Sequence, residues 1–225
     1  MVQVKQAPQN RKVVGLIYGR PGTGKTTMAV KEAPRPLVLD FFERSWEVVE
    51  APYVEVTPSN LEEVLKWLSH SQEAREYQTI IVDSLTMLQV LLTDRPMTQQ
   101  DWGQVSNLLN GLILHLTYKL PHNPHVVFLA HEKVEEEGAI STYYVPALMP
   151  SVTRTLTATT SIIGRTELSL EKRVEGGRVK ETRVYWLGLQ GHSYMAKVRN
   201  PKGEWPPKIA NPSFKSLAEL LGLTI

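Results

Sequence analysis

A glycine-rich turn followed by a lysine and two threonines is the stretch with the clearest chemistry. Residues 17–27 read IYGRPGTGKTT and follow the apolar run VVGLI, so a buried strand leads through a turn into a helix. The spacing matches the P-loop signature, in which backbone N–H groups hold phosphates, the lysine reaches the outer two and a hydroxyl binds Mg²⁺. The predicted ligand is ATP with Mg²⁺, held by Gly19, Arg20, Pro21, Gly22, Thr23, Gly24, Lys25, Thr26 and Thr27.

Hydrolysis of a triphosphate also needs an acid that holds the metal. Asp83 ends the apolar segment TIIVD and looks like the acid of a Walker B strand, at the same sheet edge as the P-loop. It could instead cap the helix that follows, although Ser84 can fill that role. Thr26 and Asp83 are therefore the predicted Mg²⁺ ligands.

Two carboxylates in the segment VLDFFERSW are candidates for the general base that activates water. Asp40 ends a buried strand and Glu43 follows three residues later. We predict that Glu43 is the base and keep Asp40 as the second candidate, and either could instead be a solvated loop residue. His131 follows HVVFLA and is a candidate γ-phosphate sensor, because ligands of open α/β sheets bind outside the carboxyl ends of strands. A structural histidine is the alternative.

Strands and helices alternate along the first 160 residues, which favours a mainly parallel sheet. Strands are expected at residues 12–19, 36–40, 79–83 and 125–130. Helices are expected after the P-loop, after Ser84, over residues 59–70 and over residues 101–120. The helix over residues 59–70 opens with Ser59 and Glu62 in the pattern of a capping box.

The pattern changes after residue 160. RTELSLEKRVEGGRVKETRVYWLGL is typical of two alternating strands joined near Gly176 and Gly177, and HSYMAKVR predicts a further antiparallel strand. The segment SFKSLAELLGL predicts a short amphipathic helix. We therefore expect an N-terminal segment at residues 1–11 and one domain over residues 12–225.

Composition limits the class of protein more than its partners. The 225 residues include no cysteine, which excludes disulfides and thiolate metal sites and suits a reducing compartment. No apolar signal core or membrane-spanning run is present, so we expect a cytoplasmic protein without a membrane partner. The formal net charge is only +2, so binding to nucleic acid would need a local basic surface.

The order of these parts resembles the RecA-like recombinase core, and in particular the short RecA/RadA-type ATPases of bacteriophages. The similarity runs from GRPGTGKTT through DFFERS, IIVDS and VVFLAH to YMAKVRNP and NPSF. It implies a RecA-like P-loop NTPase core: a mainly parallel sheet flanked by helices, with a C-terminal antiparallel extension. It also implies a homo-oligomer, either a ring or a filament, located in the host cytoplasm if the protein is viral.

The same resemblance implies two further groups of functional residues. Lys197 and Arg199, in YMAKVRNP, would act in trans on the γ-phosphate of a neighbouring subunit, although they could be ordinary basic residues of an exposed strand. DNA-facing loops would fall at residues 93–104 and 132–150, with contacts from Arg95, Trp102, Tyr143 and Tyr144, which could equally be packing residues. The run EEE at residues 135–137 departs from this expectation, because it places negative charge where phosphates should lie.

The resemblance therefore implies a Mg²⁺-dependent, DNA-stimulated ATPase of DNA recombination. It would bind single-stranded DNA, support annealing or strand exchange, and work with a single-stranded-DNA-binding or annealing protein. The alternatives are a nucleotide-binding scaffold and a motor ATPase of the helicase-loader type. A helicase loader would more often carry a second acid after Asp83, where this chain has Ser84. A small-molecule kinase would need an arginine-rich lid, which does not follow VVFLAH.

Overall fold

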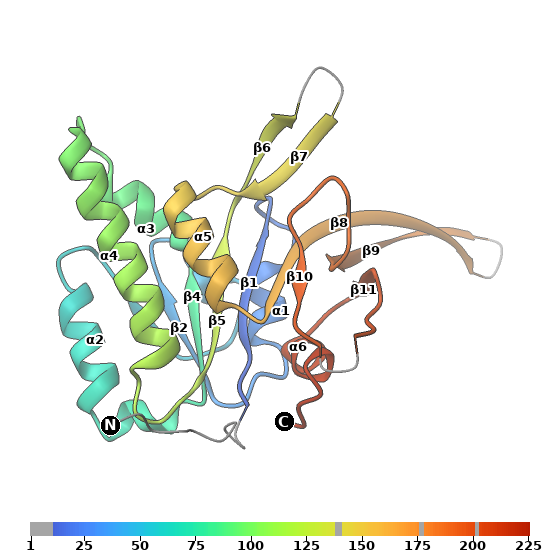
Figure 1. The fold of residues 1–225 in the computed structure, drawn as a ribbon. Helices are drawn as coiled ribbons and strands as arrows, with labels where there is room; N and C mark the ends of the chain where they lie inside the picture. Colours follow the sequence, from blue (N-terminus) through green and yellow to red (C-terminus); the bar gives the residue numbers. More distant parts are fainter. Residues whose placement is uncertain (1–10, 138–140, 176–177, 201–202) are drawn as a thin grey trace.

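The fold is built on one large mixed β-sheet (Figure 1). The structure is a computed structural model that describes residues 11–137, 141–175, 178–200 and 203–225. The strands follow the order β11-β9-β8-β1-β5-β4-β2-β3, and β10 pairs with β8. Their bounds are β1 (Val14–Gly19), β2 (Pro36–Asp40), β3 (Tyr53–Glu55), β4 (Thr79–Asp83), β5 (His125–Ala130), β8 (Ile162–Glu175), β9 (Arg178–Gly188), β10 (Lys197–Val198) and β11 (Lys208–Ala210).

The six strands from β3 to β8 in this order are parallel to their neighbours, while β9, β10 and β11 pair antiparallel. Strand β5 lies between β1, which leads into the P-loop, and β4, which ends at Asp83. This is the architecture that the sequence predicts, a mainly parallel sheet flanked by helices with a C-terminal antiparallel extension.

Helices cover both faces of the sheet. One core cluster packs α2 (Leu61–His70), α3 (Leu85–Leu92), α4 (Gln99–Tyr118) and α5 (Pro150–Thr159) against one face. A second cluster packs α1 (Lys25–Val30) and α6 (Phe214–Leu220) against the other face, as Figure 1 also shows. Two short 3₁₀ helices, Ser45–Glu47 and Glu73–Glu76, complete the helical elements of the described residues.

The central strands are apolar on both faces because both faces are buried. In β1, Leu16 and Tyr18 belong to the first core, whereas Ile17 belongs to the second. The same alternation occurs in β5, where Phe128 faces the first core and Leu129 the second. This burial explains why the strand segments are continuous hydrophobic runs in the sequence.

The predicted strands over 36–40, 79–83 and 125–130 are confirmed, and β1 begins two residues after the predicted start at residue 12. The capping box of Ser59 and Glu62 was a wrong prediction. Asn60 precedes α2 and its side-chain oxygen accepts a bond from the Thr57 N–H instead of capping the helix. A capping box does form two helices later, with Thr98 and Asp101 at the start of α4, which begins two residues before the predicted start.

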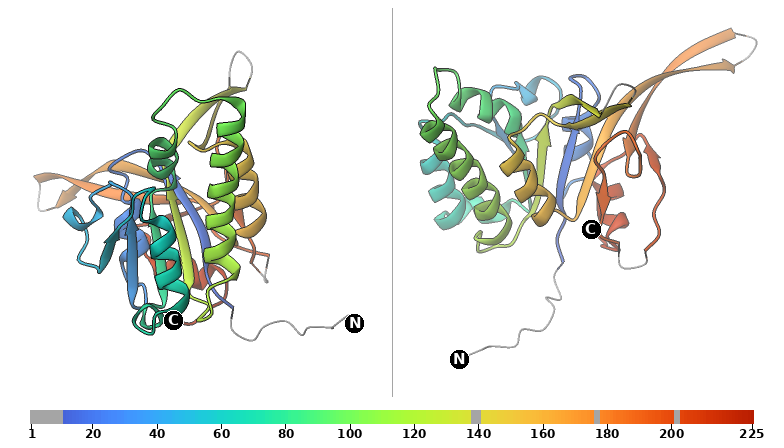
Figure 2. Two further views of the ribbon diagram at one scale, coloured as in Figure 1. Left: turned by 90° about the vertical axis from the view of Figure 1, so that its left-hand side faces the viewer. Right: turned by 45° about the horizontal axis from the view of Figure 1, so that its top comes forward.

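Two hairpins project from the body of the molecule (Figures 1 and 2). The predicted pair of strands after residue 160 forms the long β8–β9 ribbon, and its junction at Gly176 and Gly177 lies outside the described residues. Residues 132–150, expected as a loop, mostly form the hairpin of β6 (Glu132–Glu137) and β7 (Ser141–Pro146). Of the segment HSYMAKVR, only Lys197–Val198 forms a strand.

Only Arg11 of the expected N-terminal segment 1–11 lies within the described residues. The large sheet joins strands from Val14 through to Ala210. None of the helices in the described ranges combines the length and hydrophobicity that crossing a bilayer requires.

Candidate active site

The carboxyl ends of four parallel strands meet at one edge of the sheet and form the candidate site. The register aligns Asp40 with Asp83 and Tyr18 with Ala130, so the segments that follow these residues emerge side by side. A cavity of about 410 Å³ opens there. It is lined by Pro21, Gly22, Gly24, Lys25, Thr26, Thr27, Glu43, Ser45, Val48, Asp83, His131 and Tyr185.

Two glycines of the P-loop adopt positive φ angles, which glycine tolerates better than other residues. Gly22 and Gly24 adopt φ values of 76° and 80°, a region that side chains with a Cβ rarely occupy. Gly24 directly precedes α1, and a Cβ there would lie 2.8 Å from the Tyr185 ring. A larger residue at Gly24 would therefore be strained and would also displace an aromatic side chain from the cavity wall.

Lys25 is buried and points its ammonium group back at the loop. Its Nζ donates hydrogen bonds to the carbonyl oxygens of Gly19 at 3.1 Å and Arg20 at 3.0 Å. Burial lowers the pKa of Lys25, while the nearby carboxylates of Asp83 and Glu43 oppose this effect. A phosphate group would give this cation a charged partner in place of two carbonyl dipoles.

Asp83 joins the P-loop helix to the loop after β2. Its Oδ2 accepts hydrogen bonds from Thr26 Oγ1 at 2.6 Å and Ser45 Oγ at 2.8 Å. Ser84, and not Asp83, caps α3, because Ser84 Oγ accepts a bond from the Met87 N–H. Asp83 is therefore not the cap of α3, and its role as a Mg²⁺ ligand stays a prediction.

Glu43 is held at the cavity wall by two donors. Ser84 Oγ donates to Glu43 Oε1 at 2.6 Å, and His131 Nε2 lies 2.8 Å from the same oxygen. Burial raises the pKa of Glu43, but the bonds to His131 and Ser84 outweigh this effect, so the net pKa is lowered. The carboxylate therefore stays ionised near neutral pH and can accept a proton.

Asp40, the second candidate base, has a different role in the structure. Its side chain is buried, and its Oδ1 accepts bonds from the Glu43 N–H at 3.0 Å and Ser45 Oγ at 3.2 Å. It is not among the residues that line the cavity. Asp40 fixes the turn that carries Glu43, which is a positioning role.

A buried carboxylate after β5 links the P-loop to the neighbouring β6–β7 hairpin. The Glu132 side chain is only 4% exposed and lies 3.0 Å from Arg20 Nε and 2.7 Å from Arg165 Nε. The Arg165 guanidinium in turn lies 3.8 Å from the centre of the Tyr144 ring. Thr23 Oγ1 is 2.7 Å from Thr166 Oγ1, a second contact between the P-loop and β8.

Sequence reasoning missed Ser45, Tyr185 and Glu132. Ser45 lies in the quoted segment DFFERS and carried a usable signal, because it is a hydroxyl two residues after the predicted base Glu43. Tyr185 and Glu132 reach the P-loop only through tertiary contacts of β9 and β6. No local pattern marks either residue.

The residues assigned by resemblance alone lie away from this cavity. Lys197 Nζ donates to the carbonyl oxygens of Thr157 and Thr160, and Arg199 donates to that of Ala158. All of these acceptors belong to the end of α5. A contact of Lys197 or Arg199 with a nucleotide in such a P-loop cavity would therefore have to involve another subunit.

The four predicted DNA contacts are also distributed over separate elements. Arg95 pairs with Asp101 at 2.8 Å, and Trp102 in α4 is 43% exposed. Tyr143 and Tyr144 lie on β7, where the Tyr144 ring stacks on Arg165. The half-buried Tyr144 ring thus contacts Arg165, while Trp102 has an accessible ring, and DNA contact by either residue stays a prediction.

The donor set fits Mg²⁺ and a triphosphate. Mg²⁺ favours oxygen ligands and is usually held by one or two carboxylates together with substrate phosphates. Thr26 and Asp83 present a hydroxyl and a carboxylate to one cavity beside Lys25. Burial raises the pKa of Asp83, partly offset by its bonds from Thr26 and Ser45, and a cation bound there would favour the ionised form.

Comparison with known proteins identifies a family for the chain. Comparison with curated proteins found no match. Among solved structures, the chain is similar to the crystal structure of flagellar accessory protein FlaH from Methanocaldococcus jannaschii, with 14% identity, a TM-score of 0.43 and coverage of 89% of this chain and 86% of that one. The model of a family described as an AAA domain matches residues 11–203. The chain therefore belongs to this AAA domain family, AAA_24.

Proposed function

We propose that the protein is a Mg²⁺-dependent ATPase in which Glu43 is the general base. The observation that carries the proposal is that Glu43 lines the same cavity as the P-loop lysine while Ser84 and His131 hold its carboxylate. A base fixed by two donors is already oriented before substrate binds, which lowers the entropy cost of reaching the reactive geometry. The absence of a second acid after Asp83 is then no obstacle, because the neighbouring strand β2 supplies the base.

Each residue has a defined role in this scheme. The P-loop and Lys25 bind the phosphates. Glu43 accepts a proton from a water molecule while the oxygen of that water attacks the γ-phosphorus. The bond between the γ-phosphorus and the β-γ bridging oxygen breaks, giving ADP and inorganic phosphate. When bound at Thr26 and Asp83, Mg²⁺ would offset negative charge on the phosphate oxygens. His131 keeps Glu43 ionised through the bond at Oε1.

We further propose that this ATPase acts in DNA recombination, as an assembly that binds single-stranded DNA. The proposal rests on the sequence resemblance and is supported by the path of the chain after β5. His131 contacts Glu43, the next residue Glu132 contacts Arg20, and the β6–β7 hairpin begins there. A movement of Glu43 or Arg20 when the γ-phosphate binds or leaves would thus reach the β6–β7 hairpin through the adjacent residues His131 and Glu132.

Two substitutions should separate binding from hydrolysis. Glu43→Gln should retain ATP binding but lower kcat roughly 10²- to 10⁴-fold, because an amide cannot take the proton. Lys25→Ala should weaken ATP binding roughly 10- to 100-fold, because it removes a charged bond to the phosphates. Equilibrium binding and steady-state phosphate release measure the two effects. Glu47→Gln, an exposed change in the same loop, is the matched control, and normal turnover by Glu43→Gln would refute the assignment.

The pH profile should depend on His131. The pKa of Glu43 is lowered, so kcat of the parent should stay constant on the acid side until the pH falls to that value. His131→Ala removes a bond to the charged form, which raises the pKa of Glu43 and moves the acid limb of the kcat profile to higher pH. Exposed His192 provides a control substitution. An acid limb that stays in place, or moves to lower pH, would contradict the role given to His131.

A site shared between subunits predicts complementation. Arg199→Ala and Glu43→Gln should each lower turnover, and their mixture should recover part of it, because some interfaces then combine an intact Arg199 with an intact Glu43. Turnover per protomer should also rise with protein concentration. Rates that are independent of concentration, with no recovery in mixtures, would count against trans action by Lys197 and Arg199.

Nucleotide and single-stranded DNA should favour each other. If DNA binds the hairpin side, a non-hydrolysable ATP analogue should raise DNA affinity, and DNA should raise analogue affinity by the same factor. Anisotropy at several salt concentrations gives both the affinity and a slope of roughly −0.7 per neutralised phosphate. His131→Ala should reduce the coupling. Equal DNA affinity with and without the analogue would exclude coupling between nucleotide and DNA. A protein that binds no DNA even at low salt would favour the nucleotide-binding scaffold.

A further inference from the structure

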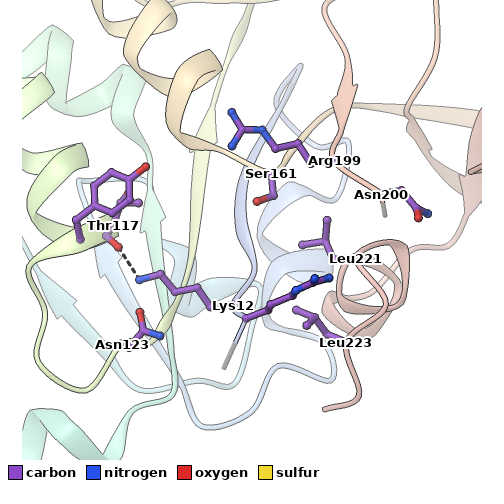
Figure 3. A pocket seen from close by; sticks show the side chains of 10 residues that line it. Lys12, Thr117, Asn123, Ser161, Arg199, Asn200, Leu221 and Leu223 are labelled. Carbon is purple, nitrogen blue, oxygen red and sulfur yellow. Dashed lines mark hydrogen bonds between the residues drawn. The ribbon is translucent and has the colours of Figure 1, made fainter. Parts of the chain in front are cut away.

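A second cavity, of about 670 Å³, lies at the opposite edge of the sheet from the P-loop (Figure 3). Lys12, Asn123 and Ser161 shortly precede β1, β5 and β8, so the cavity is at the amino ends of these parallel strands. The full lining is Arg11, Lys12, Thr117, Tyr118, Asn123, Ser161, Arg199, Asn200, Leu221 and Leu223. None of these residues lines the P-loop cavity of the same chain.

The charge of this lining is entirely positive. Arg11, Lys12 and Arg199 are its ionisable cations, and no aspartate or glutamate lines the cavity. Within the described part of the chain, none of the three forms an ion pair, whereas Arg20, Arg44, Arg95 and Arg165 all do. Three unpaired cations around one cavity of a chain with a net charge of only +2 favour an anionic ligand.

Thr117 is buried and Lys12 is half-buried in this lining. Lys12 Nζ donates to the Thr117 carbonyl oxygen at 2.6 Å, the bond drawn in Figure 3. Burial lowers the pKa of Lys12 to about 8, since no carboxylate compensates its charge. Thr117 also has a buried hydroxyl that finds no hydrogen-bond partner among the described residues. A buried hydroxyl without a partner needs an explanation, and a bound molecule that supplies the partner is one.

The rest of the cavity is suited to a ring. Tyr118, the last residue of α4, is 66% exposed beside the cations. Leu221 and Leu223 add apolar side chains after α6. Exposed aromatic rings stack on nucleobases, and arginine and lysine bind phosphate oxygens. The volume lies in the range of small-molecule sites and is far larger than one inorganic ion needs.

We propose that this cavity binds a nucleotide unit, with its phosphate on Arg11, Lys12 and Arg199 and its base against Tyr118. The unit could be a free mononucleotide or part of a nucleic-acid strand, since both present the same phosphate and ring. The site is separate from the ATPase site and does not depend on hydrolysis there.

Binding is best measured in the Lys25→Ala background without Mg²⁺, where phosphate binding at the P-loop is weakened. The probes are a fluorescent 5′-phosphorylated oligothymidylate, with thymidine monophosphate and inorganic phosphate as competitors. The double variant Arg11→Gln/Lys12→Met should lower affinity at least about tenfold, because two charged contacts are lost. Tyr118→Ala should weaken binding without any change in charge.

The matched control is Lys172→Met/Arg183→Gln, an equal loss of charge at exposed residues of the β8–β9 ribbon, and it should change affinity less than about twofold. Full competition by thymidine monophosphate would identify a free nucleotide as sufficient, whereas binding of the oligonucleotide alone would identify a strand. Equal losses in both double variants, equal competition by inorganic phosphate, or no binding of either nucleotide probe would overturn the proposal. Turnover of the parent protein is measured separately, so failure here leaves the ATPase proposal standing.

Discussion

The buried carboxylate of Asp83 is the contact on which the active-site geometry depends. It receives hydroxyl bonds from Thr26 in the P-loop helix and Ser45 in the loop after β2. These segments are far apart in the sequence and meet because β2, β4, β5 and β1 are consecutive parallel strands. Loss of the carboxylate would remove this acceptor from buried Ser45 and half-buried Thr26, and a buried polar group left unsatisfied costs roughly 1–3 kcal/mol.

A second set of hydrogen bonds fixes the position of the candidate base, Glu43. Asp40 is aligned with Asp83 in the sheet and accepts the Glu43 N–H, which fixes the turn after β2. Ser84 and His131, which follow β4 and β5, then hold the Glu43 carboxylate. Three neighbouring strands therefore determine where one carboxylate lies. Asp40 therefore holds the turn and Glu43 lines the cavity, which explains why this segment contains both acids.

Local patterns predicted the parts of this site that follow strands. The P-loop, Asp83, Glu43 and His131 each come directly after or near an apolar run, and parallel pairing brings such positions together. Tyr185 and Glu132 were not predictable, because their contacts with the P-loop depend on how β9 and β6 pack against distant segments. The hairpin at residues 132–146 was missed as secondary structure because its charged run EEE hides the alternation of a strand.

The central claim is that Glu43 is already oriented toward the γ-phosphate by Ser84 and His131. A crystal structure with Mg²⁺ and a non-hydrolysable ATP analogue tests it most directly. The account predicts that Lys25 leaves the carbonyl oxygens of Gly19 and Arg20 for the phosphates. It also predicts that Glu43 keeps both donors and contacts a water molecule beside the γ-phosphate. A structure in which Glu43 turns out of the cavity, and another carboxylate holds that water, would contradict it.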